Sequence, residues 1–89
     1  PYGQAVTREK LAMIDRAEQY LADQGFRQIR VRHHGDIARI EVPSSDRQKF
    51  FDPGFMDRVH DELVKIGFKY VALDLKGYRT GSLNETINK

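Results

Sequence analysis

The sequence contains no cysteine and no tryptophan, and only three prolines among its 89 residues. The absence of cysteine excludes a disulfide, a thiol nucleophile and a zinc-thiolate site from this chain. No apolar run approaches the ~18 residues that span a bilayer, and the first residues lack the pattern of a signal peptide. These absences are typical of a protein of a reducing compartment with no membrane partner, and we expect it in the cytoplasm.

The residues that are present suffice for a single small domain over residues 1–89. Apolar residues make up 39% and charged residues 31%, with five Phe and four Tyr, so extensive disorder is not expected. Fifteen Lys and Arg against thirteen Asp and Glu give a net charge of +2, which is too small to indicate a nucleic-acid-binding protein. The chain begins with Pro1 rather than Met, which indicates a fragment of a longer protein or a processed product.

Two helices are predicted from hydrophobic spacing. The first covers residues 8–24, between a capping Thr7 and a terminating Gly25. The second follows Asp52 and Pro53, an N-cap residue and a proline at the first helical position. Three- and four-residue steps give each helix one apolar face, formed by Leu11, Ile14, Ala17 and Leu21 in the first and by Met56, Val59, Leu63 and Ile66 in the second.

Three strands are predicted from two-residue alternation. Residues 28–34 and 37–42 flank a turn and form a hairpin, and residues 70–75 form the third strand. A short helical segment is expected at 46–51, and a capping box at 82–85 predicts a terminal turn. The order α-β-β-α-β predicts an α+β, two-layer fold, with a three-stranded mixed sheet, both helices on one face and the other face open.

Arg30 and Arg32 are the strongest local signal. They lie two residues apart on one face of the first predicted strand, so their side chains project the same way, roughly 7 Å apart. Arg27 and His34 flank them, and Arg39 lies across the hairpin. Paired guanidinium groups suit phosphate or carboxylate because each offers two parallel donors. A solvated face, or arginines paired with nearby carboxylates, explains the same spacing.

Glu18 is the second signal, because it lies within the apolar stripe of the first helix. A carboxylate is costly to desolvate there unless it is paired. One interpretation is an ion pair with a neighbouring Arg at the edge of the stripe. The other is a carboxylate held near the arginine face, where it acts as a base or binds a cationic group.

Other chemistry-bearing residues have structural interpretations. His33 and His34 point to opposite faces of a strand, so with Asp36 they form a weak metal candidate. His60 is isolated and is expected at the surface. Three aspartates, Asp46, Asp52 and Asp57, are placed to complement the start of a helix. No glycine-rich phosphate loop is present, so an ATP site is not expected in this chain.

Three stretches together resemble a known family. They are Pro1-Tyr2-Gly3, residues 25–42 (GFRQIRVRHHGDIARIEV) and residues 67–84 (GFKYVALDLKGYRTGSLN). They resemble the C-terminal domain of the LarE family, the ATP-dependent sacrificial sulfur transferases of the PP-loop superfamily. The resemblance runs nearly end to end, with residues 44–57 the least distinctive part.

The resemblance implies a longer parent enzyme with an N-terminal PP-loop domain that holds ATP and Mg²⁺. Such an enzyme adenylates a carboxylate of a nicotinate-derived mononucleotide and releases pyrophosphate. A cysteine then attacks the acyl adenylate and leaves its sulfur with the product, which feeds the nickel-pincer cofactor of lactate racemase. In some relatives an iron–sulfur cluster replaces the sacrificed cysteine. Either sulfur source would lie outside this cysteine-free chain.

By position, the resemblance implies that Arg30 and Arg32 bind the substrate phosphate and that Glu18 is an active-site carboxylate. Asp46 is the expected match for a further aspartate of the family. No cofactor is expected in this chain, which would be non-catalytic alone. Its expected partners are the mononucleotide, the PP-loop domain and further copies of itself in a homo-oligomer.

Two alternatives come from other functional classes. A small RNA-binding domain would use the basic strand face, but the first strand offers no aromatic residue there to stack on bases. A dimerisation module, as in GMP synthetases of the same superfamily, would need no ligand site.

Overall fold

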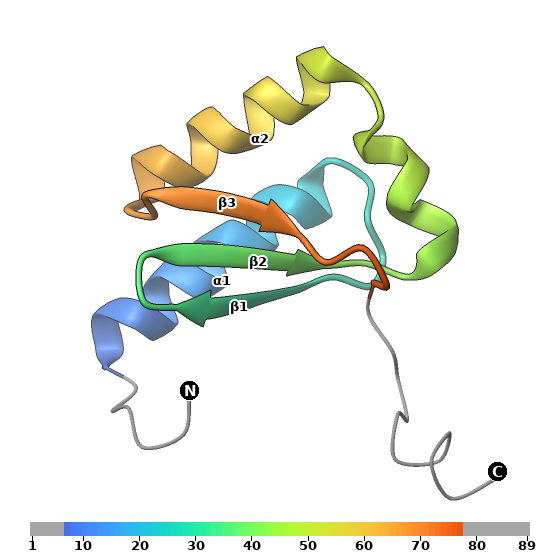
Figure 1. Cartoon of the computed structure of the whole chain (residues 1–89). Helices are drawn as coiled ribbons and strands as arrows, with labels where there is room; N and C mark the ends of the chain where they lie inside the picture. Colours follow the sequence, from blue (N-terminus) through green and yellow to red (C-terminus); the bar gives the residue numbers. More distant parts are fainter. Residues whose placement is uncertain (1–6, 78–89) are drawn as a thin grey trace, which may run out of the picture.

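A computed structural model of the chain describes residues 7–77 and confirms the predicted α+β fold. Figure 1 shows α1 passing behind the sheet and α2 running along β3. Neither helix in this part of the chain has the length and hydropathy to cross a membrane. The elements are α1 (Arg8–Asp23), β1 (Arg30–His34), β2 (Ile37–Glu41), the 3₁₀ helix η1 (Ser44–Phe50), α2 (Pro53–Ile66) and β3 (Tyr70–Leu73).

Side-chain caps fix both helix starts where the sequence predicts them. The Thr7 hydroxyl accepts a hydrogen bond from the Lys10 N–H at 3.1 Å. The Asp52 carboxylate accepts one from the Gly54 N–H at 3.2 Å, with proline at the first helical position. Each cap satisfies an N–H group that has no partner within its helix.

The sheet is mixed, in the order β1-β2-β3. The β1–β2 hairpin is antiparallel and pairs Arg30 with Glu41 and Arg32 with Arg39. The β2–β3 pair is parallel, because α2 carries the chain back to the start of the sheet. β1 and β3 are therefore the two edge strands.

One face of the sheet packs against both helices and forms the core. Rings of Phe26, Phe50 and Phe55 gather beside it, with Phe26 and Phe50 stacked at 5.3 Å between centroids. No helix of residues 7–77 covers the opposite face, which we call the open face. The buried core consists of Ala17, Leu21, Phe26, Val31, Ala38, Ile40, Val42, Phe50, Val59, Leu63 and Phe68.

Some boundaries and faces differ from the prediction. β3 ends at Leu73, two residues early, because the Asp74 carboxylate accepts hydrogen bonds from the Lys76 and Gly77 N–H groups and turns the chain. η1 begins at residue 44 rather than 46. The predicted terminal turn at 82–85 lies outside the described residues.

Three expectations for helical side chains were wrong. Leu11 and Met56 are about half exposed: the buried residues of α1 begin at Ala17, and Met56 lies at the rim of a groove. Asp57 does not complement the start of α2, because it lies beyond the first turn, which holds no acidic residue.

Gly77 offers a test of how the end of β3 is held. Its φ is +89°, and a Cβ there would collide with the Val42 carbonyl oxygen. Gly35 also has positive φ, +59°, but a Cβ there meets nothing within 4 Å. Gly35→Ala should therefore cost about 1–2 kcal/mol of backbone strain. Gly77→Ala should cost about 1–3 kcal/mol more, because backbone must move as well.

Urea unfolding of the two variants measures this difference. Equal losses in Gly77→Ala and Gly35→Ala would show that the chain after β3 is not packed against the end of β2.

Candidate functional site

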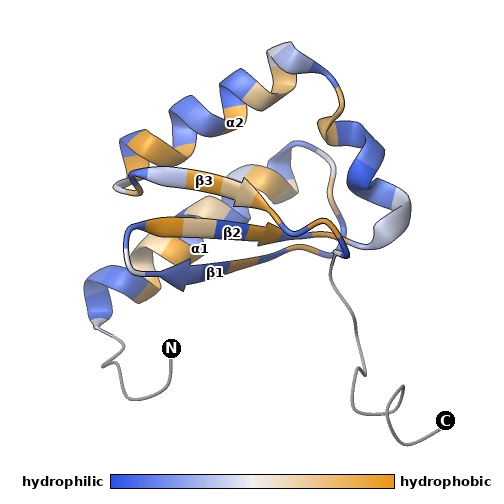
Figure 2. Ribbon diagram, viewed as in Figure 1, coloured by the Kyte–Doolittle hydropathy of each residue, from blue (hydrophilic) through white to orange (hydrophobic). Residues whose placement is uncertain are grey.

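The open face carries the arginine pair. Val31 is buried in the core and the His33 ring lies 5.1 Å from the Phe68 ring. Alternation along β1 therefore turns Arg30 and Arg32 to the open face together, as the spacing predicts. Figure 2 shows β1 as largely hydrophilic and β3 as more hydrophobic. The other open-face residues of the sheet are His34, Ile37, Arg39, Glu41, Tyr70 and Ala72.

Ion pairs link the arginines into a network that extends beyond β1. Arg32 Nε lies 3.4 Å from Glu41 Oε1, and Arg39 Nη2 lies 2.8 Å from Glu41 Oε2. Arg39 Nε lies 3.6 Å from an oxygen of Asp74, just after β3. The chain Arg32–Glu41–Arg39–Asp74 thus extends from β1 across β2 to the residue after β3, and we call it the charge ladder.

The ladder resolves a repulsion that the register creates. Arg32 and Arg39 are direct cross-strand partners, and like charges in that position destabilise a sheet. Glu41 lies two residues beyond Arg39 on the same face of β2 and pairs with both guanidinium groups. Within residues 7–77, the open face carries Arg30, Arg32 and Arg39, and Glu41 and Asp74 pair with the last two. Guanidinium groups gathered on one face suit an anion.

Glu18 reaches β1 but does not pair with an arginine. Its Oε2 accepts a hydrogen bond of 2.8 Å from the Val31 N–H. β1 is an edge strand, so this carboxylate takes the place of a neighbouring strand. Within residues 7–77, the interpretation of Glu18 as the partner of an arginine is not met, because this carboxylate accepts a backbone hydrogen bond instead. Glu18 contacts the residue between Arg30 and Arg32, at the edge of the strand rather than on the open face. Its role as a base or as a partner for a cationic group stays a prediction.

Asp46 lies apart from this arrangement. It is in the first turn of η1, as expected for a residue that complements a helix start, and it pairs with Lys49 at 3.7 Å. η1 follows the end of β2, at the same end of the sheet where β1 begins. The geometry gives Asp46 no contact with the arginine pair or with Glu18.

The two neighbouring histidines are on opposite faces, as predicted. Burial, and then the charge of Lys10, lowers the pKa of His33 below its ordinary 6.5. Burial, and then Arg39, lowers the pKa of His34, whose buried Nε2 has no hydrogen-bond partner within residues 7–77. Residues 7–77 contain no group of three His, Cys, Asp or Glu placed to hold a metal ion.

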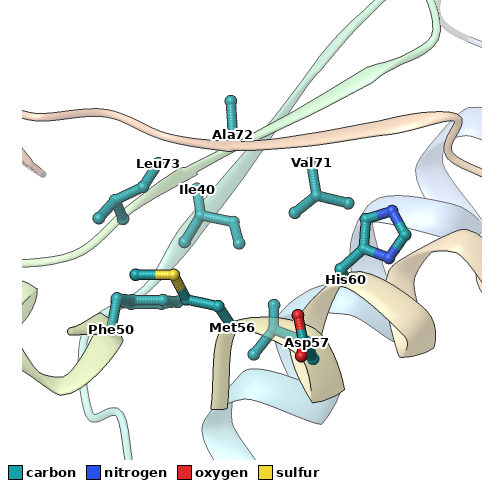
Figure 3. A pocket seen from close by; sticks show the side chains of 9 residues that line it. Ile40, Phe50, Met56, Asp57, His60, Val71, Ala72 and Leu73 are labelled. Carbon is teal, nitrogen blue, oxygen red and sulfur yellow. The ribbon is translucent and has the colours of Figure 1, made fainter. Parts of the chain in front are cut away.

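A groove lies between β3 and α2, on the opposite side of the sheet from the open face. Figure 3 shows Val71 and Leu73 pointing into it and Ala72 pointing away, with Phe50 and Met56 on its other wall. Its volume is about 340 Å³. The lining side chains are apolar apart from Asp57 and the exposed His60 and include no Lys or Arg, so the groove does not suit an anionic ligand.

Known proteins match the chain over all 89 residues. The pyridinium-3,5-bisthiocarboxylic acid mononucleotide synthase (LarE) of Lactiplantibacillus plantarum is 46% identical to it. The predicted LarE resemblance is confirmed. An uncharacterized protein of Synechocystis sp. is 42% identical. All of the chain aligns in each case, but it spans only about a third of the length of these relatives, 32% and 33%. No family model matches the chain.

Sequence reasoning missed the partners of the arginines in this LarE-like chain. Glu41 and Asp74 belong to the charge ladder, yet neither was singled out. The two-residue alternation of a strand does place Arg39 and Glu41 on the same face of the second strand. A predicted register for the hairpin would also have placed Glu41 opposite Arg30. The groove was missed as well, because its walls come from segments far apart in the chain.

The histidine environments predict a pH dependence of stability. A pKa lowered by folding means that the unfolded chain binds more protons below about pH 6.5, so the free energy of unfolding falls as the pH decreases through that value. Urea unfolding at pH 7.5 and 5.5 should show this fall. It should shrink in His33→Gln, which has no ionisable ring. Lys65→Gln, a surface change on α2, is the control. An undiminished fall in His33→Gln would refute the role of His33.

Proposed function

We propose that this chain is the substrate-binding, C-terminal domain of a LarE-like ATP-dependent sulfur transferase. Its whole-length identity of 46% to the synthase carries the proposal. That relative is named for a product with two thiocarboxylic groups on a pyridinium mononucleotide. A nicotinate-derived mononucleotide, on the route to a nickel-pincer cofactor, is the corresponding substrate for the parent of this chain. Its phosphate and carboxylates are anions, which the open face suits.

Arg30 and Arg32 would bind the phosphate of this mononucleotide. They project from one face of β1 and are both exposed, Arg32 with 44% of its side chain accessible. Within residues 7–77 the ion pair of Arg32 uses Nε, so both Nη groups can donate to phosphate oxygens. Each charge-assisted contact contributes about 1.5–3 kcal/mol, so the loss of one arginine weakens binding about tenfold or more.

Glu18 would lie beside the bound substrate rather than against its phosphate. The Val31 N–H holds one carboxylate oxygen at 2.8 Å. A carboxylate fixed in this way keeps its position while the other oxygen remains able to accept a proton or a cation. We therefore assign Glu18 to the reacting end of the substrate. Asp46 is the weaker assignment, because its carboxylate is engaged by Lys49.

The remaining chemistry would come from other parts of the parent enzyme. The chain has neither cysteine nor a glycine-rich loop for ATP phosphates, so we propose that it performs no adenylation or sulfur transfer alone. ATP and Mg²⁺ would belong to the PP-loop domain. The sulfur would come from a sacrificed cysteine or an iron–sulfur cluster, also outside this chain.

Binding of nicotinic acid mononucleotide to the 89-residue chain tests the proposal. Arg30→Ala and Arg32→Ala should each weaken binding about tenfold, because each removes a phosphate contact. Arg16→Ala, which removes an exposed arginine of α1, should have no such effect. Isothermal titration calorimetry measures the affinities. Nicotinic acid riboside, which lacks the phosphate, should bind the unaltered chain more weakly than the mononucleotide binds either variant, because the riboside loses both arginine contacts.

The same comparison shows where the proposal fails. Equal affinity for mononucleotide and riboside would contradict phosphate recognition. Equal losses in the variants of Arg30, Arg32 and Arg16 would indicate a general charge effect rather than a site.

We also propose that the domain contributes subunit contacts in a homo-oligomer. The uncovered face of the sheet and the two edge strands support this proposal. Sedimentation velocity over a wide range of protein concentration should show association, and the mononucleotide should change it if the site lies near a subunit boundary. Association that no ligand changes would favour the dimerisation module instead.

A further inference from the structure

Glu41 is the one charged residue that is buried within residues 7–77, with 7% of its surface exposed. A buried carboxylate is costly unless each oxygen is paired. Here both oxygens are used: Oε1 by Arg32 and Oε2 by Arg39, and both partners are surface arginines. The free-energy cost of burying Glu41 is thus offset only while two guanidinium groups on the open face stay paired with it.

The atoms involved set the orientation of Arg32. Its guanidinium is planar, and Nε is the atom nearest the backbone that can donate. Contact between Nε and Glu41 at 3.4 Å turns this edge of the group toward the sheet. The two Nη groups then point away from the carboxylate, as a fork for a second anion.

Arg39 fixes the carboxylate in turn. Its Nη2 donates to Glu41 at 2.8 Å, the shorter of the two contacts. Its Nε lies 3.6 Å from an oxygen of Asp74, so Arg39 also has an ion-pair partner just after β3, although not a hydrogen bond. The Glu41 carboxylate is therefore fixed by a partner that is itself fixed, and Arg32 is the end of the ladder that remains able to bind a ligand.

We propose that Glu41 is a positioning residue for the anion site, which holds the Arg32 fork ready to bind a phosphate, with Arg39 and Asp74 fixing Glu41. This inference rests on the proposed function, because it concerns the same phosphate. According to this inference, the negatively charged Glu41 strengthens the binding of an anion.

Because Glu41 is negatively charged, the direction in which its substitution changes the affinity for an anion tests the inference. A carboxylate beside an anion site repels the anion, so removal of its charge alone strengthens binding. Removal of a group that orients Arg32 weakens binding, because the fork must then be ordered when the ligand binds. The two roles predict opposite changes in affinity.

Glu41→Gln is the decisive variant, because it keeps the shape of the side chain and removes its charge. Titration calorimetry of the 89-residue chain with nicotinic acid mononucleotide should show binding weakened about fivefold or more. Asp61→Asn removes an exposed carboxylate of α2 and should not weaken binding. Binding that is unchanged or tighter in Glu41→Gln would overturn the inference.

A double variant shows whether Glu41 acts through Arg32. In an Arg32→Ala background, Glu41→Gln should cause no further loss, because the group it positions is gone. An equal further loss in that background would indicate that Glu41 supports the site by another route and would also overturn the inference.

Arg32→Lys covers the case in which Glu41→Gln does not fold. It leaves Glu41 a cationic partner but replaces the planar fork by a point charge. Its affinity should fall as far as that of Arg32→Ala, and affinity equal to that of the unaltered chain would contradict an oriented fork. If the unaltered chain binds mononucleotide no better than riboside, the proposed function fails. If it discriminates but Glu41→Gln does not weaken it, this inference alone fails.

Discussion

The position of β1 at the edge of the sheet is the constraint on which the candidate site depends. An edge strand has one row of backbone groups without a strand partner. In β1 the Val31 N–H on that side is taken by the Glu18 carboxylate. The Val31 side chain, at the same residue, is buried in the core. With Val31 fixed in both directions, the residues on either side, Arg30 and Arg32, must project from the opposite face.

The same constraint explains why Glu18 lies close to two arginines while it accepts a hydrogen bond from the backbone instead of pairing with Arg32. Glu18 belongs to α1, which lies behind the sheet in Figure 1, while the alternation along β1 turns the guanidinium groups to the open face. The carboxylate that neutralises Arg32 is instead Glu41, from the neighbouring strand. Two carboxylates thus have separate tasks: Glu18 completes the backbone pairing of β1, and Glu41 orders the arginines.

Much of this fold follows from local patterns in the sequence. Thr7 and Asp52 predict where the two helices start, because an N-cap hydrogen bond joins residues only a few positions apart. The alternation around Val31 gives the strand and its faces. The end of β3 could not be predicted in this way, since the Asp74 side chain competes for backbone donors that continued strand would have used. The exposure of Leu11 depends on how far α1 extends beyond its contacts with the sheet.

The candidate site was predictable only in part, for a related reason. Arg30 and Arg32 share a strand, so their spacing is visible in the sequence. Their relation to Arg39 and Glu41 depends on the hairpin register, and a shift by one residue would have placed Glu41 on the other face. Asp74 enters through β3, which is parallel to β2 and separated from it by a whole helix. The arginines could be predicted, but not which of them would be neutralised.

The groove between β3 and α2 shows why concavity alone is a poor guide to the anion site in this domain. It is a hollow of about 340 Å³, yet its lining includes no Lys or Arg. A phosphate placed there would lose its hydration and gain no charged donor, which is unfavourable by several kcal/mol. On the open face, by contrast, Glu41 pairs with Arg32 through Nε, so the Nη groups of Arg32 can donate to a ligand. For a small charged group, fixed donors outweigh enclosure, so the open face rather than the groove is the place to seek the mononucleotide phosphate.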